Sequence, residues 1–70
     1  MNKFKLFDVV AILHPIPEKK LSSGQVGTIV EVLADNVYEI EFIGNNGETL
    51  TTASVNSQNM LLLHYELETV

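Results

Sequence analysis

The sequence predicts an all-β domain, a small and strongly bent barrel of five short strands with one short 3-10 turn before the last strand. Three observations support this prediction. Five segments have the composition or the alternation of strands, tight turns join the middle ones, and a long loop follows the first one. Seventy residues allow one domain, which we expect over residues 1–70 with a core at about 6–65 and a frayed tail at 66–70.

The first strand is expected at residues 8–13, where valine and isoleucine are prominent and no helix-start signature is present. Its side chains alternate between two faces, with Val10 and Ile12 on one face and Val9, Ala11 and Leu13 on the other. Because both faces are apolar, something has to cover each of them.

Both prolines lie in residues 14–23, which we interpret as a long loop. Its apolar residues, Ile16 and Leu21, favour a loop that folds back over the core, although a loop of this length is also a place where function is found.

The central stretch runs from Gly24 through Gly27 to Val32. Glycine adopts backbone angles that other residues resist, so we interpret the two glycines as a tight turn that leads into a second strand at 26–33. Glu31 marks the solvent face of this strand, and the opposite face is formed by Thr28, Val30 and Val32.

The third strand, at 37–42, has the clearest alternation in the chain. We expect it to point Tyr38, Ile40 and Phe42 inward and Glu39 and Glu41 outward. The turn at 34–36 is too short for anything but antiparallel pairing with the second strand.

A hairpin turn at Asn46 and Gly47 leads into a threonine-rich fourth strand at about 48–55. A single helical turn is expected at 56–59, because asparagine and serine side chains bond to their own backbone. The last strand, at 60–65, is apolar on both faces, with Leu61 and Leu63 opposite Met60 and Leu62.

Together these elements predict an SH3-like barrel, whose closure would remove the exposed strand edges that invite aggregation. An OB-type barrel also has five strands, but it usually has a helix between the third and fourth, and residues 44–47 leave no room for one.

Residues 8–11, 24–32, 38–42 and 61–63 resemble the bacterial family catalogued as domain of unknown function 4926 (DUF4926), and the resemblance covers nearly the whole chain. It implies a stand-alone bacterial domain with an SH3-like barrel and no assigned activity. Residues 24–32 are also similar to the KOW motif of ribosomal and transcription proteins, in which a glycine turn leads into a barrel strand. The basic residues with which such motifs hold RNA are absent here.

The charge balance argues against a nucleic-acid partner. Nine acidic residues and four lysines give a net charge of −5, and the lysines Lys3, Lys5, Lys19 and Lys20 do not form the basic cluster that phosphate backbones require. The absence of cysteine leaves no disulfide framework and favours a reducing cytoplasm. Neither a signal peptide nor a membrane-spanning stretch is expected, because Asp8 interrupts the first apolar run and no later run is long enough.

The sequence contains no pattern typical of catalysis, of a metal site or of a cofactor site. His14 and His64 lie 50 positions apart, without cysteine to complete a tetrahedral set, and the serines lack a nucleophile elbow. Glu39 and Glu41 share one face, which Glu31 can join, and both a cation site and a solvated sheet face fit that pattern.

We therefore predict a non-enzymatic protein-interaction module. A chain of this length that is 46% hydrophobic cannot easily bury all its apolar residues, and an uncovered apolar patch usually marks a protein interface. The surface is expected around Val9, Leu13, Met60 and Leu62, and its partner is another protein or a second copy.

One model for this role is the small acidic partner of a second protein, as in an antitoxin or immunity protein. Two alternatives stay open. The loop and the N-terminal residues Phe4, Leu6 and Phe7 can cover the apolar surface completely, or the domain can be a KOW-like barrel bound to nucleic acid or to the ribosome.

Overall fold

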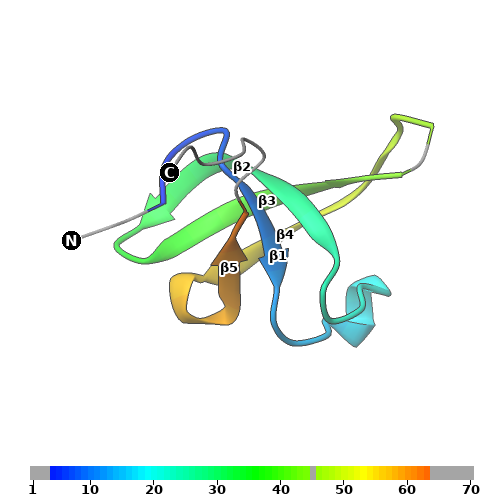
Figure 1. The fold of residues 1–70 in the computed structure, drawn as a ribbon, viewed down its shortest axis with the longest axis horizontal. Helices are drawn as coiled ribbons and strands as arrows, with labels where there is room; N and C mark the ends of the chain where they lie inside the picture. The colour runs from blue at the N-terminus through cyan, green and yellow to red at the C-terminus, as the bar shows by residue number, and fades with distance from the viewer. Residues whose placement is uncertain (1–3, 45, 64–70) are drawn as a thin grey trace, which may run out of the picture.

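The fold is one strongly bent antiparallel sheet, seen in a computed structural model that describes residues 4–44 and 46–63. The sheet has five strands in the order β4-β3-β2-β1-β5 (Figure 1). Their bounds are β1 Val9–Ile12, β2 Val26–Ala34, β3 Val37–Ile43, β4 Thr49–Asn56 and β5 Met60–Leu62. Two 3-10 turns complete the fold, η1 at Pro17–Lys19 and η2 at Ser57–Asn59.

This arrangement confirms the predicted all-β fold with a 3-10 turn directly before the last strand. The second 3-10 turn, η1, lies in the loop after β1 and was not expected. Of the last strand, residues 64 and 65 lie outside the described residues, as does the tail at 66–70. No helix in the described part of the chain has the length and hydropathy needed to cross a bilayer.

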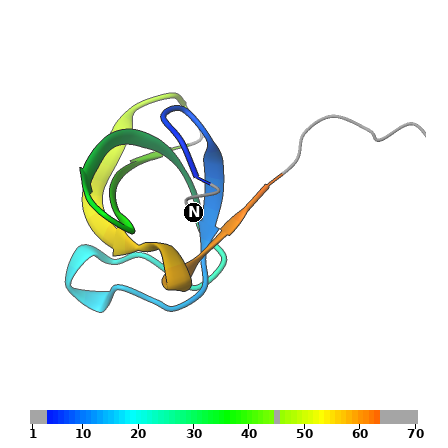
Figure 2. The ribbon, with the colours of Figure 1, turned by 90° about the vertical axis from the view of Figure 1, so that its left-hand side faces the viewer.

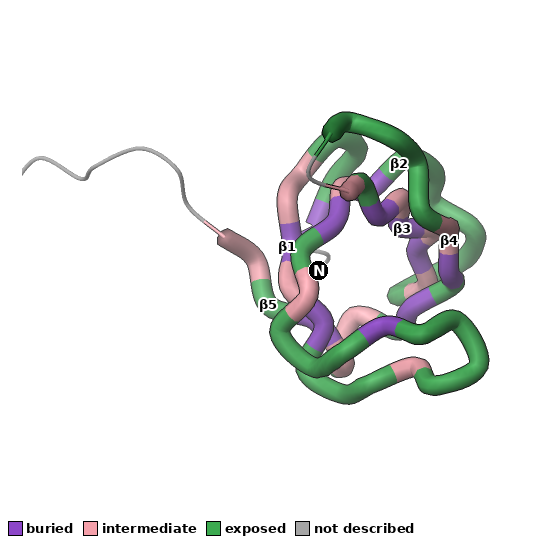
Figure 3. The backbone as a smooth tube through the Cα atoms, turned by 90° about the vertical axis from the view of Figure 1, so that its right-hand side faces the viewer, coloured by how far each residue is buried: buried purple, intermediate pink, exposed green. Residues whose placement is uncertain are grey.

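The sheet curves around a single interior (Figure 2), and each of its strands contains buried residues (Figure 3). The expected closure is absent, however, because β4 and β5 are the two ends of the sheet and do not pair with each other. The loop after β1 reaches β4 instead, where the Lys19 Nζ donates a hydrogen bond of 2.6 Å to the Thr52 carbonyl. One free strand edge is thus met by a loop rather than by a strand.

The core is built on the alternation of β3. Tyr38, Ile40 and Phe42 are completely buried, as their spacing predicts. Phe4, which precedes the first strand, is also buried and belongs to the same core. The other core residues come from every strand and from the loop, and they are Val10, Ile12, Leu21, Ile29, Ala53, Val55 and Met60.

The loop at residues 14–23 folds back over the core, as predicted. Ile16 and Leu21 form an isolated antiparallel bridge with backbone hydrogen bonds of 2.9 and 3.1 Å. Leu21 is 4% exposed and Ile16 packs against the core. The two apolar residues therefore hold the loop in place, with η1 exposed between them.

The predicted faces of β2 are wrong. Val30 and Val32 are exposed, and the buried residues are Gly27 and Ile29. A register shift between Ile29 and Glu31 interrupts the alternation, and such a shift cannot be read from a run of β-branched residues.

Gly27 lies inside β2 rather than in the turn, which belongs to Gly24 with its φ of +88°. Its neighbours are Val10 of β1 and Phe42 of β3. A Cβ at this position would lie 2.6 Å from Ile40 Cγ2 and 2.8 Å from the Glu41 carbonyl oxygen. A close approach to β3, and not a turn, therefore requires glycine here.

We predict that Gly27→Ala lowers the free energy of unfolding by about 2–3 kcal/mol, because the new methyl group meets buried side chains and backbone. Urea unfolding followed by circular dichroism measures this change. Gly44→Ala is the matched control, since the three atoms nearest to its methyl group would all belong to the flexible Glu48 side chain. Equal effects of the two substitutions would contradict this explanation.

Tyr38 carries the one buried side-chain polar atom that lacks a hydrogen-bond partner among the described residues, its hydroxyl oxygen. The ring itself packs well, with its centroid 5.8 Å from that of Phe4 at an interplanar angle of 60°. A buried hydroxyl without a partner is costly, so the ring stabilises the core while the hydroxyl weakens it.

Tyr38→Phe is therefore expected to raise the free energy of unfolding by about 1 kcal/mol, because it removes only the unpaired hydroxyl. Tyr38→Leu, which also removes the ring contact, should lower it by about 1–3 kcal/mol. Both values come from the same urea unfolding measurement. A clear loss of stability in Tyr38→Phe would show that the hydroxyl has a partner.

Candidate functional site

The outer face of β1 is apolar and only partly covered. Val10 and Ile12 point into the core, so Val9, Ala11 and Leu13 face outward. This alternation was predicted. It means that the covered face and the open face of β1 are built from the same run of apolar residues.

A row of apolar side chains crosses three strands on this face. Ala11 lies opposite Leu61 of β5 on one side and opposite Val26 of β2 on the other. Residues directly opposite each other in a sheet point to the same face, so all three side chains share the outer surface. We call Leu61, Ala11 and Val26 the outer apolar row.

The two ends of the row are open to solvent, and Ala11 between them is partly buried. Leu61 is 52% exposed and Val26 is 43% exposed. Val9, which is partly buried, precedes Ala11 on the outer face of β1, and Leu13, which is 44% exposed, directly follows the strand. Both extend the row. The result is a continuous apolar area over β5, β1 and β2.

Two of the four predicted surface residues do not belong to this area. Met60 is 4% exposed and lies in the core, and Leu62 packs against the core. Their partners in the ladder are Ile12 and Val10, which point inward. The prediction joined the outer face of β1 to the inner face of β5, because the register between two strands that are distant in sequence cannot be read from either strand alone. Leu61 is the residue that it missed.

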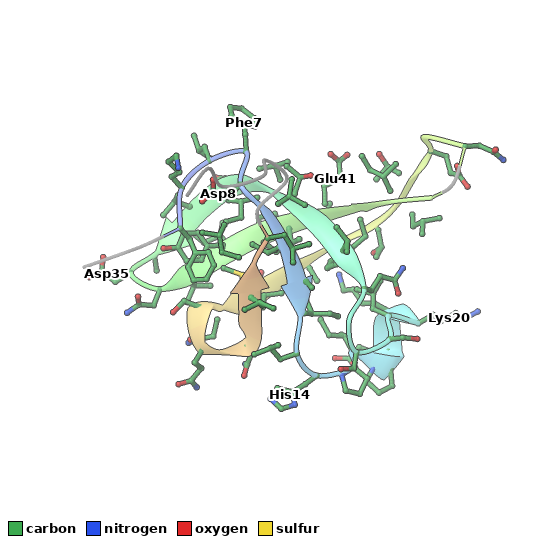
Figure 4. All side chains as sticks on the ribbon, viewed as in Figure 1. Phe7, Asp8, His14, Lys20, Asp35 and Glu41 are labelled. Carbon is green, nitrogen blue, oxygen red and sulfur yellow. The ribbon has the colours of Figure 1, made fainter. Side chains whose placement is uncertain are left out.

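Phe4, Leu6 and Phe7 leave the outer face partly open. Phe4 is buried, but Leu6 is 46% exposed and Phe7 is 72% exposed. Figure 4 shows Phe7 pointing away from the body of the domain. Its φ of 71° is unusual for a bulky residue, and no sequence signal could have indicated it. Among the described residues, the loop and these N-terminal side chains leave Leu13, Val26 and Leu61 exposed on this face.

The predicted acidic face is present on β2 and β3. Glu31 lies directly opposite Glu39, while Glu41 lies opposite Thr28. Hydroxyl groups of β4 stabilise two of these carboxylates, since Thr49 Oγ1 donates to Glu41 at 2.8 Å and Ser54 Oγ to Glu39 at 3.3 Å. No cluster of His, Asp and Glu within residues 4–44 and 46–63 has the grouping of a metal site.

The remaining candidate groups are not brought together. His14 is exposed in the loop, and His64 lies outside the described residues. The Ser23 hydroxyl donates a hydrogen bond to the Leu13 carbonyl at 2.8 Å and so stabilises the conformation of the loop. Asn46 and Gly47 form the predicted hairpin turn, where Gly47 has a φ of +83°.

A cleft of about 240 Å³ lies between the loop and the end of β4. It was not predicted, because it exists only where the sheet fails to close. Its lining is Ile12, His14, Pro15, Ile16, Glu18, Ser54, Val55, Asn56 and Asn59.

A family model described as "Domain of unknown function (DUF4926)" matches residues 6–62 of this chain. The chain belongs to the DUF4926 family. No curated protein and no solved structure matches it. Since the description of DUF4926 names no activity, the role of this DUF4926 protein has to be argued from its surfaces.

The Glu31–Glu39 pair in this DUF4926 domain generates a testable prediction. Like charges directly opposite each other destabilise a sheet, so Glu31→Lys should raise the free energy of unfolding by about 0.5–1 kcal/mol at low salt. Glu18→Lys changes the net charge equally at an exposed residue outside the sheet and is the control. Thermal unfolding at two salt concentrations measures both. An equal gain in the control would show that only the net charge matters.

Proposed function

We propose that this DUF4926 protein is a non-enzymatic interaction module that binds another protein, or a second copy of itself, through the outer apolar row. The observation that carries this proposal is the register of β5, β1 and β2, which places Leu61, Ala11 and Val26 side by side. Single exposed apolar residues are ordinary on a protein surface, but a contiguous apolar area is typical of an interface.

The size of the domain supports the same role. A core of this size contributes little stability, and association adds to it by burying further apolar surface. The open face of β1 and β5 is the place where such burial is available.

The charge of the domain indicates the class of partner. With a net charge of −5, a basic protein is favoured over an acidic one, as in a small acidic partner of the antitoxin or immunity type. The lack of cysteine supports a reducing, cytoplasmic setting for this role. Nucleic acid is a disfavoured partner, because two of the lysines that could bind phosphate already have partners within the domain. Lys5 forms an ion pair with Asp8 at 3.4 Å, and Lys19 donates a hydrogen bond to the Thr52 carbonyl.

We expect the double substitution Leu61→Lys with Val26→Lys to abolish partner binding with little loss of stability, because both side chains are about half exposed. The measurement is the solution mass by light scattering over a dilution series, followed by affinity capture from a lysate of the source organism. The unsubstituted chain should form an oligomer or retain a protein, and the variant should do neither.

The matched control is Leu33→Lys with Leu50→Lys, which adds the same charge at residues that are 45% and 50% exposed outside the row. This control should bind like the unsubstituted chain. A chain that is monomeric at every concentration and captures nothing contradicts the proposal, and so does equal loss of binding in both variants. Capture of nucleic acid that weakens steeply with salt would favour the KOW-like alternative.

A further inference from the structure

Within residues 4–44 and 46–63, no strand lies beside the outer edge of β4, because β4 ends the sheet on that side. A backbone hydrogen bond fixes which groups of β4 point to this edge. Ser57 N–H donates to the Asn36 carbonyl at 2.8 Å, directly after the paired residues Val37 and Asn56. Hydrogen-bonded and non-hydrogen-bonded pairs alternate in an antiparallel ladder. Asn36 and Ser57 are thus a hydrogen-bonded pair. Tyr38–Val55 and Ile40–Ala53, which lie two and four positions further along the ladder, are therefore hydrogen-bonded as well.

It follows that Thr52, Ser54 and Asn56 direct their backbone groups away from β3 and toward the free edge. The Lys19 contact agrees with this assignment, since its Nζ reaches the Thr52 carbonyl from the loop on that side. Lys19 thereby occupies one acceptor of the edge. The N–H and C=O of Ser54 are the next pair along the strand.

Open space adjoins this pair. The cleft of about 240 Å³ is lined by Ser54, Val55 and Asn56 on the β4 side. Ile12 and Val55, which are buried, make its base apolar, and the loop from His14 to Glu18 forms the opposite wall. Unpaired strand groups, an apolar base and a second wall are the features of a site that receives an added strand.

We propose that this cleft binds an extended segment of a partner polypeptide as an additional strand on β4. One residue of the segment accepts a hydrogen bond from Ser54 N–H and donates one to Ser54 C=O. The side chains of the segment alternate, so an apolar one enters the cleft above Val55 and its neighbours lie on the outer face beside Ser54.

The acidic side chains on the outer face of β3 favour basic residues at the outward-facing positions of the bound segment. The Ser54 hydroxyl bonds to Glu39, and Glu41 lies two residues further along β3 on the same face. A lysine or arginine on the added strand has a side chain long enough to approach these carboxylates across β4. The site is separate from the outer apolar row, so this inference does not depend on the function proposed above.

The first experiment uses a synthetic heptapeptide, capped at both ends, that alternates valine with lysine. Titrated into the full chain labelled with ¹⁵N, it should shift the amide signals of β4 at Ser54 and Asn56 and those of the loop at His14, Ile16 and Glu18. It should also slow hydrogen exchange at Ser54. The same peptide with N-methyl groups on its β4-facing residues should bind roughly tenfold more weakly or not at all, because it lacks the donors to the edge. A valine–glutamate peptide should also bind more weakly.

The second experiment changes the edge itself. Ser54→Pro removes an N–H that the β3–β4 ladder does not use, so the domain should stay folded while the peptide binds roughly tenfold more weakly or not at all. Ser54→Thr keeps the N–H and should bind like the unsubstituted chain. Circular dichroism checks that both variants are folded. If Ser54→Pro is unfolded, the N-methylated peptide, titrated into the unsubstituted chain, takes its place as the test.

Three results would overturn the proposal. The first is no saturable binding of the valine–lysine peptide, or equal binding of its N-methylated form. The second is a set of shifts confined to the outer apolar row, which would place the peptide on the other surface. The third is a shift of Ser54 with protein concentration alone, which would make a second copy the occupant.

Discussion

The close contact between β2 and β3 at Gly27 is the constraint on which the rest of the structure depends. Gly27 lies in the middle of the sheet, between Val10 and Phe42. Only a residue without a Cβ lets Ile40 and Phe42 pack over the backbone of β2 at this distance. Since β3 supplies three completely buried side chains, its position on β2 determines how the interior is filled.

The same contact sets the register of β1 and, through it, the outer surface. Because side chains alternate with a period of two, a slip of one residue would exchange the faces of β1. With Val10 beside Gly27, the core receives Val10 and Ile12, and the solvent side receives Val9, Ala11 and Leu13. The outer apolar row is thus a direct consequence of how the core is packed. Both proposed sites, the row and the β4 edge, lie where this packing leaves apolar side chains or backbone groups without a partner.

Local patterns in the sequence predicted most of the fold. The alternation of β3, the positions of the strands, the hairpin turn at Gly47 and the folding back of the loop by Ile16 and Leu21 were all readable, because each depends on residues close together in the chain. The predicted resemblance to DUF4926 is confirmed by the match of the family model to residues 6–62.

The features that could not be predicted depend on contacts between distant residues. The pairing of β5 with β1 decides that Leu61 is outside and Met60 inside, and neither strand alone contains that information. The register shift after Ile29 and the missing closure between β4 and β5 are likewise properties of the assembled sheet. For the same reason the cleft beside Ser54 had no sequence signal.

The central claim is that the sheet is open, with one edge at β4 and an apolar outer face on β1. Hydrogen exchange of individual amides in the free domain, followed by NMR, tests it most directly. We expect strong protection of Ala53 and Val55, whose N–H groups bond to β3, and fast exchange of Ser54, whose N–H points to the free edge. Equal protection of all three amides would show that another strand covers β4 and would contradict the account.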